Sequence, residues 1–285
     1  MASVIFIVLN GYQGAVNLYA ITFISGRLSG TTANPQQAAI FLASGVPCLM
    51  FLFESYKKWD WIKAMLVGCL VLTALALFLT GSRTGILTAL VTLMMFYRTN
   101  GGAMVRLGLF ASVVLVVTLP FLIQDGTLLG ANYDINMVAD RFTSGENTRA
   151  DVWSGMWRAF SNNPLFGAPL QGDRLGYGEN SWLAAGAALG LMGFIPLVLF
   201  TLECLKMMLD LNGLSKRHPK YFLHCSTVIA ALASLLIGSV FEAFLLGNLS
   251  SFVLTLLIYL SLGQYLMEVE KREQATLQHY AIYGG

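Results

Sequence analysis

Residues 54–80, ESYKKWDWIKAMLVGCLVLTALALFLT, decide the fold, because three lysines precede or open a long apolar run. The apolar part, 61–80, has the length of about 20 residues that a helix needs to cross ~30 Å of hydrocarbon. Lysine in a short loop beside such a run is typical of the cytoplasmic face of a membrane protein. This stretch therefore predicts a transmembrane helix that begins in the cytoplasm.

The rest of the chain repeats this pattern. Only 11% of its 285 residues are charged and 56% are hydrophobic, whereas roughly 25% charged residues is usual in soluble domains. We therefore expect an all-α, polytopic membrane helix bundle of about seven spans, forming a single membrane domain over residues 1–285. The predicted spans lie near 36–53, 61–80, 82–97, 104–123, 181–202, 221–241 and 244–267.

The lysines orient this bundle, because all of them fall in or beside gaps on one side: Lys57, Lys58, Lys63, Lys206, Lys216, Lys220 and Lys271. Positive charge in short loops marks the cytoplasmic face. The loops 54–60, 98–103 and 203–220 and the tail from 268 are then cytoplasmic, and 10–35, 124–180 and 242–247 face outward. The outer face, counting the outer ends of the spans, holds arginines but no lysine, which asks for a functional explanation: Arg27, Arg83, Arg141, Arg149, Arg158 and Arg174.

The 124–180 loop is the only large segment outside the predicted spans. Within it, Thr143 and Glu146 fit a capping box. Apolar residues then recur at helical spacing from 152 to 160, which predicts an amphipathic helix over 146–160 with Trp153 and Trp157 at the membrane interface. Asn162-Asn163-Pro164 is expected to end it. Arg149 and Arg158 lie in its polar part, where they either touch lipid phosphate or bind substrate.

A glycine-rich stretch follows and leads to Glu179 and Asn180 at the start of the next predicted span. A partly desolvated carboxylate there can accept a proton near neutral pH. The alternative is that Glu179 only caps the helix start. Gly186 and Gly190 form a G-x-x-x-G pattern, which favours close helix packing. Glu242, at the outer end of another span, either pairs with an arginine or takes part in catalysis.

Several classes of function are excluded by what the sequence lacks. The three histidines, at 218, 224 and 279, all lie on the predicted cytoplasmic side. We therefore expect no histidine base and no histidine-ligated metal at the outer face. The four cysteines show no C-x-x-C or other metal-ligand spacing, and we expect inert buried thiols. The sequence has no phosphate-binding glycine loop and no basic nucleic-acid patch, so we expect no nucleic-acid partner.

An ordered set of motifs resembles the O-antigen ligase and O-antigen polymerase superfamily of bacterial envelope enzymes. The set covers roughly residues 20–260 and comprises GRLSGTTANPQQAAIF (26–41), GSRTG (81–85), RFTSGENTRADVW (141–153), NNPLFGAP (162–169) and GENSWLAAGAALGLMGF (178–194). The resemblance implies a multi-pass protein of the bacterial inner membrane with its active site facing the periplasm. It would transfer a glycan from an undecaprenyl-pyrophosphate carrier to a hydroxyl acceptor, without a metal or other cofactor. The acceptor is lipid A core for ligases and the next lipid-linked glycan for polymerases.

The resemblance also implies roles for individual residues. Arg141 and Arg149 would hold the pyrophosphate, since arginine binds phosphate bidentately and stays charged when desolvated. Glu179 would be the catalytic base, with Asn180 orienting it. Further candidates for substrate binding are Arg83 and Arg27, which could instead snorkel to the membrane surface, together with Arg158 and Glu242.

Two departures from the family pattern bear on this interpretation. Glu179 stands where ligases have histidine, which favours the polymerase-like members. Family enzymes have several helices ahead of the first motif, whereas this chain starts just before it, and we expect a fragment, a sequence with a wrongly assigned start, or a reduced homologue. The alternatives are a non-catalytic homologue or a transporter of lipid-linked glycan, although a transporter favours charged residues at mid-membrane.

Overall fold

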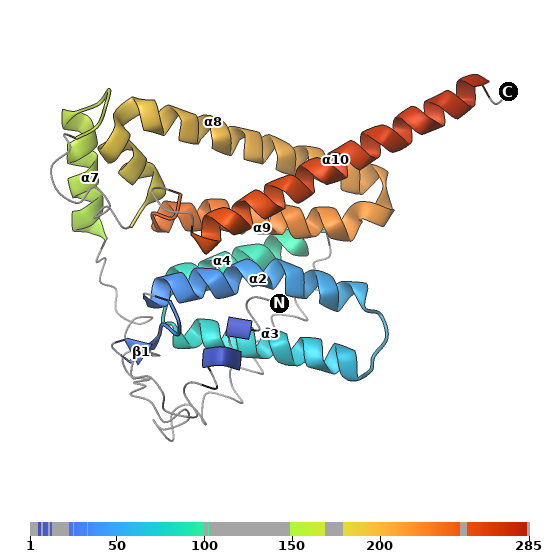
Figure 1. Ribbon diagram of the computed structural model, residues 1–285, viewed down its shortest axis with the longest axis horizontal. Helices are drawn as coiled ribbons and strands as arrows, with labels where there is room; N and C mark the ends of the chain where they lie inside the picture. The colour runs from blue at the N-terminus through green and yellow to red at the C-terminus, as the bar shows by residue number, and fades with distance from the viewer. Residues whose placement is uncertain are drawn as a thin grey trace. The chain divides into compact units, whose positions relative to one another are not determined.

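The computed structural model describes residues 5, 6, 8–10, 12, 23, 24, 26–32, 34–99, 102, 149–168, 179–245 and 250–283. Apart from a two-stranded hairpin, its regular elements are helices (Figure 1). The chain divides into two compact units, Met1–Val152 and Trp153–Gly285. Each unit is described by itself below. The predicted span 104–123, Arg141 and the capping residues Thr143 and Glu146 lie outside the described residues.

The first unit is built on three helices, α2 (Pro35–Ser55), α3 (Trp61–Leu79) and α4 (Arg83–Phe96), preceded by the antiparallel hairpin β1 (Phe23–Ile24) and β2 (Arg27–Leu28). Helix α2 packs against both α3 and α4. Its contact with α4 is close, because a Cβ added to Gly85 would lie only 2.5 Å from the Cβ of Ala39.

Side-chain caps fix where these helices begin. Asn34 accepts a hydrogen bond from the Gln37 amide, and Ser82 accepts one from the Gly85 amide. Asp60 accepts the amides of Ile62 and Lys63 at the start of α3. A hydrogen bond from the Tyr56 hydroxyl lowers the pKa of Asp60, so the cap stays ionised at neutral pH. Such caps satisfy backbone donors that have no partner within the helix.

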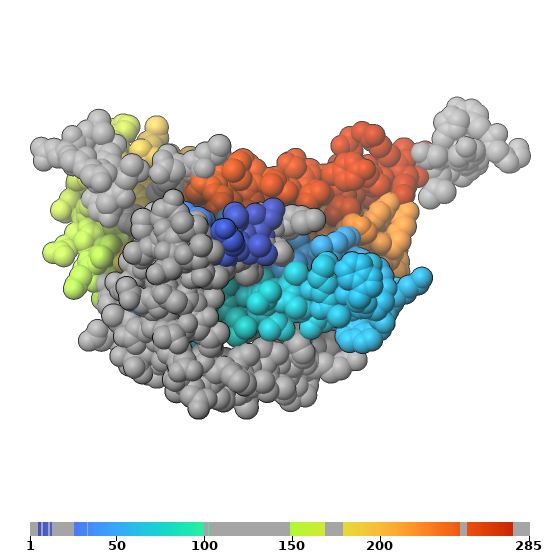
Figure 2. Space-filling view, turned by 60° about the horizontal axis from the view of Figure 1, so that its bottom comes forward, coloured from blue at the N-terminus to red at the C-terminus, as the bar shows by residue number. Residues whose placement is uncertain are grey.

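The second unit contains most of α7 (Ala150–Asn162), then α8 (Ser181–Arg217), the short 3₁₀ helix η3 (Pro219–Tyr221), α9 (Phe222–Phe241) and α10 (Ser251–Tyr283). Helix α9 forms its centre, being buried over most of its length and packed against both α8 and α10. In contrast, α10 is open along one side, seen in red-orange in Figure 2. Large apolar residues are exposed along α10, as expected of a helix that faces lipid: Leu254, Leu257, Ile258, Leu262 and Tyr265.

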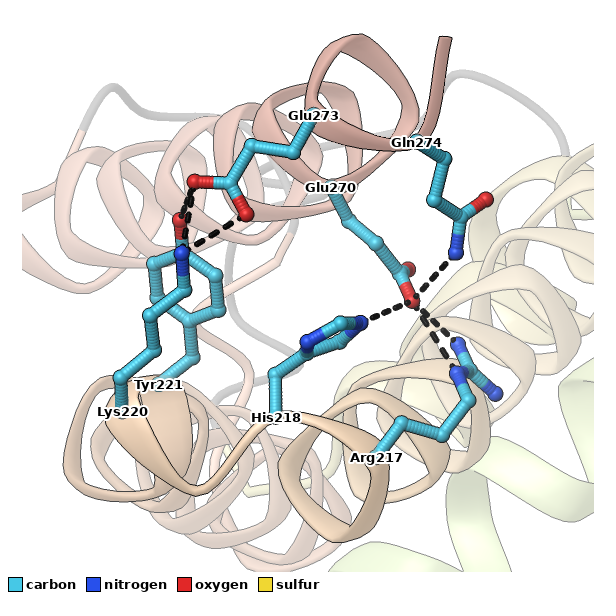
Figure 3. A network of polar contacts seen from close by, with 7 residues as sticks. All are labelled: Arg217, His218, Lys220, Tyr221, Glu270, Glu273 and Gln274. Carbon is cyan, nitrogen blue, oxygen red and sulfur yellow. Dashed lines mark hydrogen bonds and ion pairs between the residues drawn. The ribbon is translucent and has the colours of Figure 1, made fainter. Parts of the chain in front are cut away.

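A polar network ties α10 to the turn between α8 and α9 (Figure 3). The carboxylate of Glu270 is buried and accepts two hydrogen bonds from the Arg217 guanidinium, at 2.8 and 3.0 Å. The His218 Nε2 lies 3.6 Å from the same oxygen. Glu273 forms an ion pair with Lys220 at 2.7 Å. The network fixes the direction in which α10 continues beyond the bundle.

The structure confirms the predicted fold class. Within the described residues, five helices are long and apolar enough to cross a membrane, and α4 is a shorter apolar helix. The predicted spans 36–53, 61–80, 82–97 and 221–241 match α2, α3, α4 and α9 to within two residues at each end. The prediction of one membrane domain over residues 1–285 stays a prediction.

Two predicted boundaries were wrong. Helix α8 continues to Arg217, so most of the 203–220 segment that we expected to be a loop is helical. Helix α10 begins at Ser251 rather than 244 and continues to Tyr283. At the C-terminal end of both helices, the helix continues beyond the apolar run. The residues there, such as lysine, glutamate and methionine, have high helix propensity. Hydropathy marks where a membrane ends, whereas propensity and capping decide where a helix ends.

Candidate functional site

The corner between α3 and α4 gathers arginines in the first unit. Arg27, from β2, donates from Nε to the Thr80 carbonyl at 2.8 Å and from Nη2 to the Gly81 carbonyl at 3.4 Å. Gly81 has a positive φ of 58°, and a Cβ there would lie 3.1 Å from the Arg27 Nε. Arg27 therefore satisfies carbonyl groups at the end of α3, where a helix leaves acceptors without intrahelical donors.

Arg149 reaches the same corner from a distant part of the sequence. Its Nη2 donates to the Thr84 hydroxyl at 3.2 Å, and Thr84 is a buried residue in the first turn of α4. Arg83, the residue before Thr84, is exposed. Thus three arginines predicted to bind substrate lie at or contact residues 80–84. The positive end of the α4 helix dipole also lies at this corner, and it favours the binding of an anionic ligand.

The start of α8 and the end of α9 form a corner that holds the predicted acid in the second unit. Glu179 directly precedes α8, and its backbone carbonyl accepts a hydrogen bond from the Trp153 indole Nε1 at 3.3 Å. The hydroxyl of Ser181 donates to the carbonyl of Glu242 at 2.7 Å and accepts the Leu245 amide at 3.3 Å. A buried serine at the start of α8 therefore links this helix to the residues that follow α9.

The cap of α8 is Asn180. Its Oδ1 accepts the amides of Trp182 and Leu183 at 2.8 and 2.9 Å. The capping role that the sequence left open for Glu179 thus belongs to its neighbour. The Asn180 side chain is buried and directed at backbone amides, so it holds the start of α8 in place, which also fixes the backbone next to Glu179.

The remaining predicted residues divide between the two units. Glu242 is buried and ends α9 as its C-cap residue. Arg158 is exposed on α7, and its Nε donates to the Ser154 carbonyl at 3.3 Å. Arg141 lies outside the described residues. Sequence reasoning missed the polar roles of Trp153 and Ser181, because an indole near a membrane interface and a serine at a helix start both have ordinary explanations.

Helix α7 was predicted and is present. The expected helix covered 146–160, and the described helix is Ala150–Asn162, ending at the Asn162-Asn163-Pro164 sequence as predicted. Met156, in its apolar stripe, is fully buried. Trp153 packs against Phe241, with ring centroids 6.4 Å apart, whereas the Trp157 side chain is 57% exposed. The two tryptophans therefore have different surroundings, one in the bundle and one outside it.

Long apolar helices with polar corners at their ends define a multi-pass membrane protein. Residues 68–198, slightly less than half of the chain, match the family model described as O-antigen ligase. This match confirms the resemblance to the O-antigen ligase and polymerase superfamily that the motifs indicate, and it supports a role in glycan transfer. The matched range includes Arg83, Arg149 and Glu179. No curated protein matches the chain.

Proposed function

We propose that this protein transfers a glycan from an undecaprenyl-pyrophosphate carrier to a hydroxyl acceptor at the periplasmic face of the bacterial inner membrane. The family match supports the general reaction, glycan transfer in O-antigen synthesis. The one-sided lysine distribution supports the orientation.

The observation that carries the proposal is that Arg83 and Arg149 lie at or contact the first turn of α4, while Arg27 contacts the residues just before it. The donor's pyrophosphate is anionic before transfer, and it gains charge as its bond to the sugar breaks. Fixed positive groups aimed at that charge lower the barrier by several kcal/mol in favourable cases. We assign Arg149 and Arg83 to the pyrophosphate, together with Arg141. Arg27 has a supporting role, since its guanidinium holds the carbonyls at the end of α3.

Glu179 is the proposed base. The acceptor hydroxyl oxygen attacks the anomeric carbon of the donor sugar, and the bond from that carbon to the pyrophosphate oxygen breaks. The hydroxyl proton passes to the Glu179 carboxylate, and the undecaprenyl pyrophosphate leaves. A positioned base of this kind contributes roughly 10²–10⁴-fold. The reaction as proposed assigns charge neutralisation to arginine and needs no cofactor.

The acceptor follows from the type of base. A carboxylate at the position of the ligase histidine favours a polymerase-like reaction, in which the acceptor is a second lipid-linked glycan rather than lipid A core. Complementation separates the two. The chain is expressed in strains that lack either the ligase or the polymerase, and lipopolysaccharide is resolved on gels. Restored glycan ladders in the polymerase-deficient strain support the proposal.

The complementation needs a control that keeps the protein intact. Arg272→Ala serves, because Arg272 is an exposed arginine on α10, away from the candidate site in the sequence, and it pairs with Glu268, four residues before it, at 2.8 Å. It should complement like the natural sequence, while Arg149→Ala should not. Failure of the natural sequence in both strains, with normal membrane expression, would count against the proposed function.

A further inference from the structure

Helix α8 is broken near its start. Gly190 has φ 61° and ψ −152°, which lies outside the helical region, and α8 changes direction near its N-terminal end (Figure 1). The segment that follows α7 fills the break. The amides of Leu191 and Met192 donate to the carbonyls of Pro164 and Leu165, at 2.7 and 3.4 Å, and the Ala168 amide donates to the Ala187 carbonyl at 2.8 Å. We call residues 163–168 and 187–192 the α8 joint.

Two glycines make the joint fit. A Cβ on Gly190 would lie 2.5 Å from the carbonyl of Leu165, and a Cβ on Gly167, which also has positive φ, would collide with the carbonyl of Ala188. Each glycine thus lets the other segment's backbone approach. Backbone groups that have no helical partner at the break therefore form hydrogen bonds with the neighbouring segment.

The outer surface of the joint is apolar. The side chains of Leu165, Phe166 and Met192 are 59%, 73% and 69% exposed. Further along α8, exposed apolar residues continue at helical spacing: Ile195, Leu199, Leu202, Leu205 and Leu209. Residues three and four apart lie on one face of a helix, so the joint forms the end of a single apolar stripe on a helix that is long and apolar enough to cross the membrane.

The length of that stripe shows how far the hydrocarbon extends. The stripe runs past Leu202 to Leu205 and Leu209, which are 44% and 72% exposed. From the break, Leu191–Leu209 covers about 28 Å at 1.5 Å per residue. The hydrocarbon core is about 30 Å thick, so the joint lies where the hydrocarbon ends on that side.

We propose that the α8 joint lies at the edge of the hydrocarbon, in the leaflet at the α7 end of this unit, with Leu165 and Phe166 in contact with lipid acyl chains. Irregular backbone is tolerated in a membrane only where protein or a water-filled cavity covers it, and the three cross-joint hydrogen bonds pair six backbone groups of the joint within the protein. Helix α7 stays at the water boundary, because Asp151, Ser154 and Arg158 on its polar face are exposed. The inference is independent of the proposed reaction.

Site-specific photocrosslinking tests it. The photoreactive residue p-benzoylphenylalanine replaces Phe166 in the full-length protein, reconstituted in vesicles of phosphatidylethanolamine and phosphatidylglycerol. The same replacement at Leu202 is the lipid-facing control, and at Lys57, in an exposed polar loop, the aqueous control. After irradiation, mass spectrometry counts lipid adducts. Position 166 should give adducts within about threefold of position 202 and at least tenfold above position 57.

Three results would overturn the inference: adducts at 166 no more frequent than at 57, crosslinks at 166 mainly to a second protein molecule, or an equal yield at all three positions. If the benzoyl group prevents folding, Phe166→Trp provides a second measurement. The added fluorescence should be quenched by lipids brominated on the acyl chains and not by aqueous acrylamide. Quenching by acrylamide alone would place the joint in water.

Discussion

The indole Nε1 of Trp153 lies 3.3 Å from the backbone carbonyl of Glu179 and donates a hydrogen bond to it. Helix α7 is thereby attached to the residue that precedes α8, 26 positions later in the chain. The Trp153 ring also packs on Phe241, at the end of α9. One side chain therefore connects three helices at the corner that holds the candidate base.

Trp153→Phe should show whether this contact positions Glu179. The substitution keeps an aromatic ring but removes the indole donor, which costs about 0.5–1.5 kcal/mol for a typical hydrogen bond. We expect glycan transfer by the purified protein to fall by about two- to tenfold. The matched control is Trp157→Phe, since Trp157 is exposed on the same helix. Equal activity of the two variants would remove Trp153 from any positioning role.

Arg149→Ala and Arg141→Ala should each reduce transfer at least tenfold while membrane expression is unchanged. Loss of a charge-assisted contact to a partly desolvated phosphate costs about 2–5 kcal/mol. Arginine-to-lysine variants should recover little activity, because lysine lacks the planar fork. Transfer assays with a lipid-pyrophosphate donor measure both, with Arg272→Ala as the control. Full activity of either alanine variant would exclude that arginine from the site.

Gly190→Ala should destabilise the protein. Its backbone conformation is one that only glycine adopts readily, so the substitution costs about 1–3 kcal/mol of strain, and the new Cβ would meet the Leu165 backbone. Gly68→Ala is the matched control, since Gly68 lies within α3 with no atom within 4 Å of an added Cβ, and alanine favours helix by about 1 kcal/mol. Thermal unfolding in detergent should show a lower Tm for the first variant and an unchanged or higher Tm for the second.

Gly186 and Gly190 show which features of the fold could be predicted from the sequence and which could not. Membrane-length apolar runs predicted α2, α3 and α9, because the thickness of a membrane sets their length, and a shorter apolar run predicted α4. The G-x-x-x-G at 186–190 predicted packing, and a Cβ on Gly186 would indeed lie 3.0 Å from the Phe160 ring. Gly190 instead breaks α8. Its positive φ depends on a loop more than twenty residues earlier, and no local pattern records that partner.

The candidate site, too, was predicted from the sequence only in part. Sequence reasoning selected Arg27, Arg83 and Arg149 as outward-facing arginines, and all three lie at or contact the α3–α4 corner. It did not separate their roles. Arg27 is directed at carbonyls 53 and 54 positions away, and such a contact depends on how β2 meets the end of α3. Likewise, the sequence left a capping role open for Glu179 alone, and the structure assigns the cap to Asn180.

The predicted membrane orientation can be tested at two positions of the second unit. Lys206→Cys should be protected from an impermeant maleimide in cells with a permeabilised outer membrane, because it lies on the predicted cytoplasmic side, whereas Asn162→Cys at the end of α7 should react. Both positions are exposed, so neither is hidden by packing. The four native cysteines are first replaced by serine or alanine. Labelling of position 206 but not 162 would reverse the orientation.

The last prediction concerns Glu179, which stands where family ligases carry histidine. If Glu179 is the base, Glu179→Gln keeps the shape of the side chain but removes the proton acceptor, and transfer should fall roughly 10²–10⁴-fold. Glu179→His should then keep partial activity, because imidazole accepts a proton in the same role. The cap of α8 belongs to Asn180, so neither substitution should greatly change thermal stability, whereas Asn180→Ala should lower it by about 1 kcal/mol. Transfer and unfolding measured on the same purified variants separate chemistry from structure. Near-normal turnover of Glu179→Gln would refute the base assignment and leave the arginine cluster as the remaining support for catalysis.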